Sequence, residues 1–222
     1  MIPKIIHQIH LGGSELTDQE KTWQQTWSTY NPDWELKLWD EHAIEKLPIK
    51  NKPQLERCKN YSEMSDILRF EILYQYGGLY IDTDFECLKS ITKLIQCTEC
   101  TPKPELIIFN QGPKMLCGAF MASTKLNSDI KGLVDGVEER EKSHGHSSAH
   151  GKYGPVYLTD KLGLEAAYQL PEDWKPSGYL VYGYKKTPKS EKQDNSHDAL
   201  KQRYPKSYAI HHWHGSWKDQ VL

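Results

Sequence analysis

Between residues 61 and 76, apolar side chains recur every three or four positions, which is the spacing of one face of an α-helix. Asn60 or Ser62 can cap the start of this helix. The glycine pair at positions 77–78 ends it, because glycine adopts the left-handed backbone that a helix end often requires. The apolar run at residues 79–81 then predicts a buried central strand. The apolar face of the helix comprises Met64, Ile67, Leu68, Ile72 and Tyr76.

The same periodicities predict further elements on both sides of this helix and strand. A chain in which strands and helices alternate forms an α/β layer, where ligands bind beyond the carboxyl ends of the strands. Helices are predicted at residues 14–30 and 40–47, and a turn with a short helix at residues 88–94. Strands are predicted at residues 4–10, 34–39, 106–109, 117–122, 178–184 and 208–210.

Two stretches have no apolar period. Residues 138–151 pass from charged side chains to serine, glycine and histidine, so we expect a solvated loop. Histidines can bind a metal, but a loop of this composition holds ligands poorly, and we expect no metal site there. Residues 185–197 form a lysine-rich insert without a core face, which we expect at the surface. The histidines of the first stretch are His144, His146 and His150.

Composition and charge mainly exclude classes of protein and of partner. A chain of 222 residues suits one domain over residues 1–222, and a net charge of −2 argues against a nucleic-acid partner. No apolar run approaches the roughly 20 residues of a membrane span, and the N-terminus lacks the apolar region of a signal peptide. We therefore expect no membrane span and a cytoplasmic location. Five irregularly spaced cysteines predict reduced thiols rather than a disulfide framework.

Candidate chemistry lies where the central strand ends. If the strand continues, Asp82 and Asp84 share one face, because side chains alternate along a strand. Two carboxylates this close repel each other unless a cation lies beside them. Asp66 and Arg69, three residues apart on the preceding helix, lie on one face, and an arginine near acids and a metal suits a phosphate-bearing ligand. For an isolated D-x-D, a solvated acidic turn is the alternative.

These residues carry a family resemblance. The segment SDILRFEILYQYGGLYIDTDFE resembles the core of glycosyltransferases with a DXD sugar-binding region, a group that includes fungal Golgi mannosyltransferases, bacterial capsule and lipopolysaccharide transferases and, more distantly, glucosylating toxins. The opening IPKIIHQIHLGG and the closing AIHHWHGSW are similar to the first strand and C-terminal segment of that family. The resemblance implies a single GT-A-like α/β domain, with a mixed, mostly parallel sheet flanked by helices.

The resemblance also implies an activity. It predicts a metal-dependent glycosyltransferase that moves a sugar from a nucleotide diphosphate sugar, expected to be a UDP-sugar, to a hydroxyl of a glycan or protein, with retention of anomeric configuration. The cofactor would be Mn²⁺ or Mg²⁺, which take oxygen ligands and stabilise the departing diphosphate. Asp84 is the first expected metal ligand, and Asp82 would contact either the ribose or, through water, the metal. Asp66 and Arg69 would hold hydroxyls of the donor sugar, so Asp66, Arg69 and Asp82 are the expected catalytic residues.

Further donor contacts are expected at both ends of the chain. In the family, a tryptophan often stands where His10 stands and stacks on the nucleotide base, a contact that histidine makes more weakly. The C-terminal segment is expected to close over the donor, with His212 as a metal ligand and His211 and His214 as close competitors. Strand alternation places His212 and His214 on one face and His211 on the other. The alternative for this segment is a core plug. The expected donor-binding residues are His10, Gly12, Ser65, Tyr80, Ser216 and Trp217.

Two other functions remain open. A degenerate, non-enzymatic domain would bind a nucleotide sugar without turning it over. A phosphatase of the D-x-D-x-T type would use the first acid as its nucleophile, but its motif needs Thr or Val at the position that Glu86 occupies.

Overall fold

The computed structural model describes residues 1–96, 102–110, 113–145, 147–168, 181–183 and 194–214. The helices are α1 Asp18–Tyr30, α2 Glu41–Glu45, α3 Lys52–Leu55, α4 Tyr61–Tyr76, α5 Thr92–Ile95, α6 Ser128–His144, α7 Ala149–Lys152, α8 Pro155–Leu162 and α9 His197–Arg203. The strands are β1 Ile5–Ile9, β2 Glu35–Trp39, β3 Gly78–Ile81, β4 Phe85–Cys87, β5 Leu106–Asn110, β6 Leu116–Ser123, β7 Val181–Gly183 and β8 Ala209–His211. The predicted helices and strands around the Gly77–Gly78 turn are confirmed.

The strands form two sheets. The larger sheet has the order β2-β1-β3-β6-β5, in which β1 runs parallel to β2 and β3, and β6 runs antiparallel to β3 and β5. The smaller sheet has the order β4-β8-β7, with β8 antiparallel to β4 and parallel to β7. The predicted mixed sheet is confirmed, but only half of the strand pairs in the larger sheet are parallel, so "mostly parallel" was too strong.

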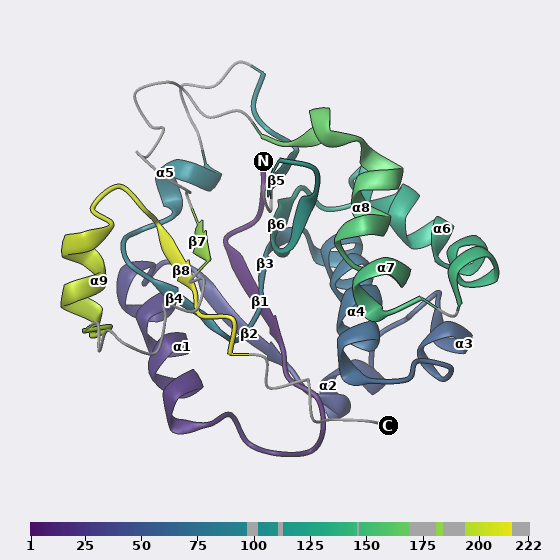
Figure 1. The fold of residues 1–222 in the computed structure, drawn as a ribbon, viewed down its shortest axis with the longest axis horizontal. Helices are drawn as coiled ribbons and strands as arrows, with labels where there is room; N and C mark the ends of the chain where they lie inside the picture. The colour runs from purple at the N-terminus through teal and green to yellow at the C-terminus, as the bar shows by residue number, and fades with distance from the viewer. Residues whose placement is uncertain (97–101, 111–112, 146, 169–180, 184–193, 215–222) are drawn as a thin grey trace.

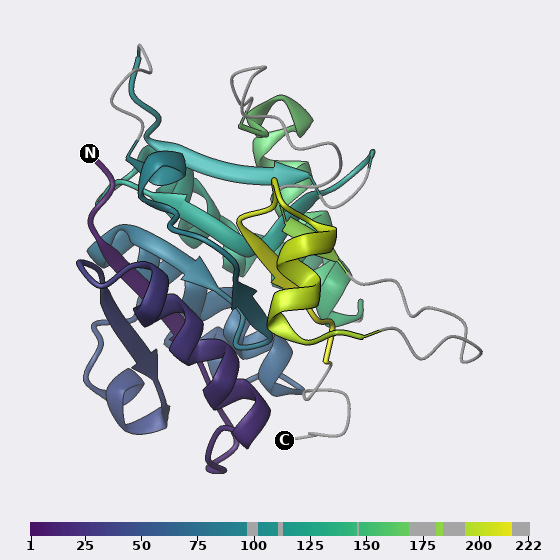
Figure 2. The ribbon, with the colours of Figure 1, turned by 90° about the vertical axis from the view of Figure 1, so that its left-hand side faces the viewer.

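Helices cover both faces of the larger sheet. In Figure 1, α4, α6, α7 and α8 lie on one side of it, and α1, α9 and the smaller sheet lie on the other. Figure 2, turned by 90°, shows α1 and α9 in front of the sheet. Each side has its own apolar core: one contains the buried face of α4 with residues of α6 and α8, and the other contains Trp27 of α1 with Phe85 of β4.

Helix α4 begins and ends where the sequence predicts. Asn60 caps it by accepting a hydrogen bond from the backbone N–H of Glu63 at 2.9 Å. Gly77 and Gly78 have φ angles of 65° and 99°, and a Cβ atom on Gly78 would lie 2.5 Å from the carbonyl oxygen of Ile5. The tight turn at these glycines therefore lets α4 pack directly against β1 and β3.

His7 of β1 stabilises this turn by a hydrogen bond to its backbone. Its Nε2 lies 2.8 Å from the carbonyl oxygen of Gly77, and Trp39 Nε1 donates to its Nδ1 at 3.1 Å. The ring therefore donates through Nε2 and accepts through Nδ1, which is the neutral form. Burial lowers the pKa of His7 to about 4, although the bond to Gly77 opposes the shift. His7 thus belongs to the core as a neutral hydrogen-bonding group.

The prediction of a solvated loop over residues 138–151 was wrong for most of its length. Helix α6 continues to His144, and α7 follows at Ala149–Lys152. The buried Arg140 explains the difference, because its Nε donates to the carbonyl oxygen of Lys152 at 3.0 Å and its Nη1 pairs with Asp160 at 2.8 Å. A charged side chain therefore occupies a core position that an apolar pattern does not reveal. His146 and most of the insert at 185–197 lie outside the described residues.

Among the helices that the structure describes, none combines the length and the apolar character needed to cross a membrane.

Candidate active site

A cleft of about 780 Å³ opens at the carboxyl ends of β1 and β3. Its walls come from four segments of the chain, and its floor comes from the ends of β1 and β3. The floor residues are Ile9, His10 and Leu11 at the end of β1, and Tyr80, Asp82, Thr83 and Asp84 at the end of β3. This is the position that the sequence predicts for a ligand site in an α/β layer. The wall residues are Lys59–Glu63, Ser65, Asp66 and Arg69 of the α4 region, Gly118 and Ala119 of β6, Ser147–His150 and Pro155 near α7 and α8, and His211 and Trp213 near the C-terminus.

Two aspartates and a histidine meet at one end of the cleft. Asp82, Asp84 and His211 each offer a ligand atom, and these atoms lie within 4.8 Å of one another. The aspartates stand in the turn between β3 and β4 rather than in a continued strand. His211 Nε2 lies 3.1 Å from Asp84 Oδ1, and the backbone N–H of His214 donates to Asp84 Oδ2 at 2.9 Å. We call these three residues the carboxylate–histidine cluster.

The cluster suits a divalent cation. Asp84 Oδ1 is buried, and its contact with His211 Nε2 at 3.1 Å lacks the geometry of a hydrogen bond. Burial opposes ionisation of Asp84, but His211 and the N–H of His214 outweigh that effect, so its pKa lies below the ordinary value. Buried carboxylate oxygens without a donor are rare in proteins unless an ion or water completes them. Two carboxylates and an imidazole are a donor set that Mn²⁺ accepts.

The structure groups His211, and not His212, with the aspartates. The His211 ring is stacked between Phe85, with centroids 4.3 Å apart, and Trp213, at 4.0 Å. His212 Nε2 instead lies 2.8 Å from Glu86 Oε2, so its ring faces away from the cluster. The predicted alternation between the two histidines is correct, but the pairing of β4 with β8 brings His211 to the metal-binding side. The geometry therefore groups His211, rather than the expected His212, with the two aspartates.

Asp66 and Arg69 form a buried ion pair on the wall above the cluster. Arg69 Nη2 lies 2.8 Å from Asp66 Oδ1 and 3.8 Å from Asp82 Oδ1. The two residues are only 4% and 6% exposed. Burial raises the pKa of Asp66 to about 7, although the Arg69 guanidinium opposes this shift. The predicted pairing on one helix face is thus present, and it reaches the first aspartate of the D-x-D.

Arg69 is held from three sides. Its guanidinium lies over the Tyr80 ring, 4.7 Å from the centroid, and its Nε donates to the carbonyl oxygen of Ser65 at 3.3 Å. The Tyr80 hydroxyl donates to Asp82 Oδ1 at 2.7 Å. A Cβ atom on Gly118 would lie 2.6 Å from Arg69 Nη1, so glycine at this position makes room for the guanidinium.

The other expected donor contacts divide into three groups. His10, Ser65 and Tyr80 line the cleft as expected, and His10 Nε2 lies 3.0 Å from the carbonyl oxygen of Ser14. Gly12 is not among the lining residues, because its N–H is directed to Glu41 Oε1 at 2.6 Å. Ser216 and Trp217 lie outside the described residues, so their predicted role over the diphosphate stays a prediction.

Sequence reasoning missed two parts of the cleft. Gly118 was read only as part of a strand, although a glycine within an apolar strand is a signal for close approach of another group. The wall at Ser147–His150 was expected to be a solvated loop, and no local pattern shows that it faces the start of α4. Both positions depend on contacts between distant segments.

Comparison with known proteins confirms the resemblance. Residues 17–101 match the family model described as a glycosyltransferase sugar-binding region containing a DXD motif. The chain is 31% identical to inositol phosphoceramide mannosyltransferase 3 of Schizosaccharomyces pombe over 98 residues, which are 42% of this chain and 27% of that protein. It is 34% identical to mannosyl phosphorylinositol ceramide synthase SUR1 of Saccharomyces cerevisiae over 99 residues, 43% of this chain and 26% of that protein. The matches thus span about a quarter of the length of these relatives.

Structural comparison confirms the fold. The chain superimposes on the PaToxG glycosyltransferase with a TM-score of 0.57 and 20% identity, covering 74% of this chain and 70% of that chain. The GT-A-like architecture expected from the sequence is therefore present, and residues 17–101 match the family model of the DXD region.

Proposed function

We propose that this chain, whose residues 17–101 carry the DXD glycosyltransferase region, is a metal-dependent glycosyltransferase that uses a nucleotide diphosphate sugar. The observation that carries the proposal is the carboxylate–histidine cluster at the end of a cleft whose wall holds the buried Asp66–Arg69 pair. A cation site beside a fixed guanidinium supports binding of a diphosphate and of the sugar attached to it.

Three residues of the chain would hold the metal. Asp84 would supply the buried Oδ1, Asp82 a half-exposed carboxylate, and His211 its Nε2. When bound, a divalent ion supplies positive charge that stabilises the negative charge of the departing diphosphate. We propose Mn²⁺ or Mg²⁺ as the ion, because carboxylate oxygens suit both and an imidazole ligand favours Mn²⁺.

Arg69, Asp66 and Tyr80 would position the donor. The planar guanidinium presents several N–H donors in fixed directions, so it can hold two oxygens of the donor at once. The Asp66 carboxylate orients that guanidinium at 2.8 Å and can accept from a sugar hydroxyl, while Tyr80 fixes Asp82. Because these side chains are already held by their partners, the site loses little side-chain freedom when the donor binds.

The opposite wall is the place for the acceptor. The start of α4 and residues 147–150 face the cleft with hydroxyl and imidazole groups, a surface that suits a hydroxyl-bearing glycan or protein segment. The family resemblance supports transfer with retention of anomeric configuration and a UDP-sugar as donor. Proton NMR of the product anomer, followed from the first turnovers, tests the stereochemistry directly.

The decisive experiment measures release of nucleotide diphosphate from a panel of UDP- and GDP-sugars with Mn²⁺, with Mg²⁺ and with EDTA. We expect release that requires the ion and that is lost in Asp84→Asn. Binding of the sugar nucleotide without turnover by the full panel would favour the degenerate binding domain. Release of phosphate from a monoester would favour the D-x-D phosphatase, whose motif this chain lacks at Glu86.

A further inference from the structure

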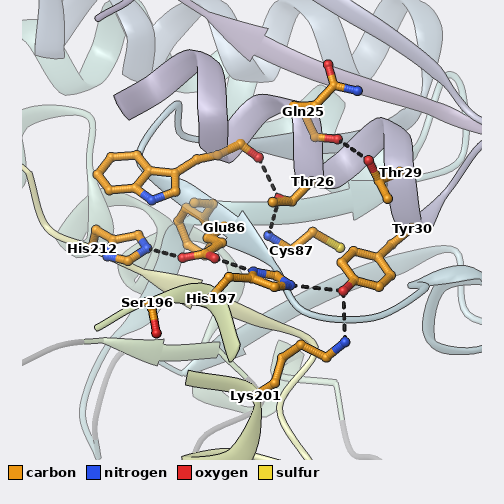
Figure 3. Close-up of polar contacts among 12 residues, drawn as sticks. Gln25, Thr26, Thr29, Tyr30, Glu86, Cys87, Ser196, His197, Lys201 and His212 are labelled. Carbon is orange, nitrogen blue, oxygen red and sulfur yellow. Dashed lines mark hydrogen bonds and ion pairs between the residues drawn. The ribbon is translucent and has the colours of Figure 1, made fainter. Parts of the chain in front are cut away.

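Glu86 of β4 is a buried carboxylate that lies outside the cleft. It is 4% exposed, and His212 Nε2 donates to its Oε2 at 2.8 Å while His197 Nδ1 contacts its Oε1. Figure 3 shows the carboxylate between the two imidazoles. A buried carboxylate is costly unless it is paired and hydrogen-bonded. Both oxygens of Glu86 are satisfied, and the two partners come from different segments, α9 and the residue after β8.

Helix α1 holds both histidines from the other side. The His212 ring lies flat on Trp23, with centroids 4.1 Å apart and an interplanar angle of 9°. The Tyr30 hydroxyl lies 2.9 Å from His197 Nε2 and accepts from Lys201 Nζ at 2.8 Å, as Figure 3 shows. Each imidazole therefore contacts Glu86 through one nitrogen and α1 through its ring face or its other nitrogen.

Strand β4, which carries Glu86, is itself fixed to α1. Trp27 Nε1 donates to the carbonyl oxygen of Phe85 at 2.9 Å, and the N–H of Cys87 donates to Thr26 Oγ1 at 2.8 Å. The residues on both sides of Glu86 are thus anchored. The backbone at Glu86 is therefore held in place, and its side chain can position His197 and His212.

These contacts determine which histidine reaches the aspartates. In the β4–β8 register Phe85 pairs with His211, and the stacked rings of these two residues share one face of the smaller sheet. Adjacent residues of a strand point to opposite faces, so a bond that keeps His212 on the face of Glu86 keeps His211 on the face of Phe85, from which its Nε2 contacts Asp84 Oδ1 in the turn before β4 at 3.1 Å. A slip of one residue would exchange the two side chains.

We propose that Glu86, His197 and His212 form a positioning clamp that holds β8 in the register in which His211 faces Asp82 and Asp84. The clamp rests on the proposed function, since it serves the metal ligands, and it assigns a role to three residues that lie outside the cleft lining. Buried ion pairs often add little stability compared with apolar residues of the same size. The contribution of the clamp is therefore the selection of one register, a role for which single buried polar residues are well attested.

The first test is Glu86→Gln. The amide keeps the shape of the side chain, but its NH₂ group cannot accept from a histidine N–H. We expect the Kd for Mn²⁺, measured by electron paramagnetic resonance of the free ion without any sugar nucleotide, to rise about 10- to 100-fold, as for other groups that orient metal ligands. The melting temperature of the metal-free protein should change no more than in the control.

The matched control is Glu71→Gln. Glu71 is also buried, at 2% exposure, and its Oε1 accepts from the backbone N–H and the side-chain Nδ2 of Asn51 at 2.9 and 2.8 Å. It lies on α4 but does not line the cleft. We expect this variant to bind Mn²⁺ as the wild type does, so that loss of a buried carboxylate alone does not explain the effect at Glu86.

His212→Phe separates the clamp from direct ligation. Phenylalanine keeps the flat contact with Trp23 but removes the bond to Glu86. If the clamp acts as a unit, the double variant Glu86→Gln/His212→Phe has the same Kd for Mn²⁺ as the single variant that binds the ion less tightly. The reason is that the free-energy effects of mutating two residues in one network do not add. Should Glu86→Gln fail to fold, His212→Phe and His197→Phe carry the test, each with an expected loss of about tenfold or more.

Two results would overturn the clamp in distinguishable ways. If wild type binds Mn²⁺ and Glu86→Gln binds it equally well, while His212→Phe loses affinity, His212 is itself a ligand and the clamp is wrong although the proposed function stands. If the wild-type protein binds no divalent ion, the proposed function fails and the clamp fails with it.

Discussion

The two sheets of this protein are built in different ways and carry different tasks. In the larger sheet, β1 pairs with β2 and β3, and all eight residues of β6 are buried. In the smaller sheet, β4 pairs with β8, and the bond between Glu86 and His212 joins residues 126 positions apart. Both sheets bury apolar side chains, but the smaller one is joined in addition by the imidazole–carboxylate contacts of Glu86. We therefore expect changes in the larger sheet to lower the free energy of unfolding, and changes at its junction with the smaller sheet to lower ligand affinity.

The largest effect should follow from Asp84→Asn at that junction. The variant removes the charge of the buried carboxylate in the carboxylate–histidine cluster, so we expect the Kd for Mn²⁺ to rise by about 1000-fold or more, which exceeds the loss typical of residues that only orient ligands. The free energy of unfolding without metal should fall by about 1 kcal/mol, because asparagine loses the charged contacts with His211 and with the N–H of His214. Calorimetric titration and urea unfolding provide the two measurements.

Asp160→Asn is the control for this variant. Asp160, within α8, pairs with Arg140 at 2.8 Å and does not line the cleft. It should leave Mn²⁺ binding unchanged. Equal Mn²⁺ affinity of Asp84→Asn and wild type would remove Asp84 from the metal site and with it the contrast between the sheets.

In the larger sheet, His7 should make stability depend on pH. Its pKa is about 4 in the folded protein and about 6.5 when unfolded, so the unfolded state binds the proton more readily. The stability that neutral His7 contributes is present in full above pH 6.5 and is lost as pH falls towards 4, by about 3 kcal/mol. Urea unfolding at pH 7 and pH 4.5 should show a smaller pH dependence for His7→Gln than for wild type.

The same variant should bind Mn²⁺ normally at pH 7, because His7 lies outside the cleft lining. An identical pH dependence of wild type and His7→Gln would show that His7 is not held neutral by the core.

Arg69→Lys tests a residue of helix α4 that packs on the larger sheet and approaches Asp82 at 3.8 Å. Lysine keeps the charge beside Asp66 but loses the planar set of donors, so we expect turnover to fall about 100-fold, or about 2.7 kcal/mol in the transition state, with the fold retained. Steady-state kinetics with the identified donor measure the loss.

Arg57→Lys is the matched control, because Arg57 also binds a carboxylate through two nitrogens, at 3.1 and 2.7 Å from Glu141, but on the surface. Its turnover should equal that of wild type. If the two lysine variants behave alike, the Asp66–Arg69 pair is structural.

The smallest effect is expected for Gly118→Ala in β6. The new Cβ atom would lie 2.6 Å from Arg69 Nη1 and 3.0 Å from Leu158 Cδ1, so the guanidinium must shift. We expect a loss of about 1 kcal/mol in unfolding free energy and a fall in turnover of about tenfold. Gly132→Ala, in open space on α6, should instead stabilise the protein slightly, because alanine is the better helix former. Unchanged turnover in Gly118→Ala would show that Arg69 tolerates displacement.

Local patterns predicted the larger sheet and its helices well. The start and end of α4 depend on Asn60 and on Gly77–Gly78, which act on backbone atoms a few residues away. The pairing of Asp66 with Arg69 follows from helical spacing alone. Such features are visible in sequence because the interacting groups are neighbours along the chain.

The parts that sequence reasoning missed depend on distant contacts. The helical end of α6 is held by Arg140, whose partners are Lys152 and Asp160, so the apolar pattern gave no sign of it. The choice of His211 over His212 depends on how β8 pairs with β4. Alternation correctly separated the two histidines, but only the register states which face meets the aspartates.

The distance along the chain between the halves of the carboxylate–histidine cluster has a consequence for biosynthesis. Every strand of the larger sheet precedes residue 124, whereas the backbone contact from His214 reaches back 130 residues to Asp84. Domains fold progressively as the chain leaves the ribosome, and contacts between distant segments form late. A nascent chain with its main sheet in place therefore still lacks the histidine of the carboxylate–histidine cluster. Under the proposed function, ion capture would follow assembly of the main sheet, and a chain interrupted before residue 211 would lack the imidazole of the carboxylate–histidine cluster.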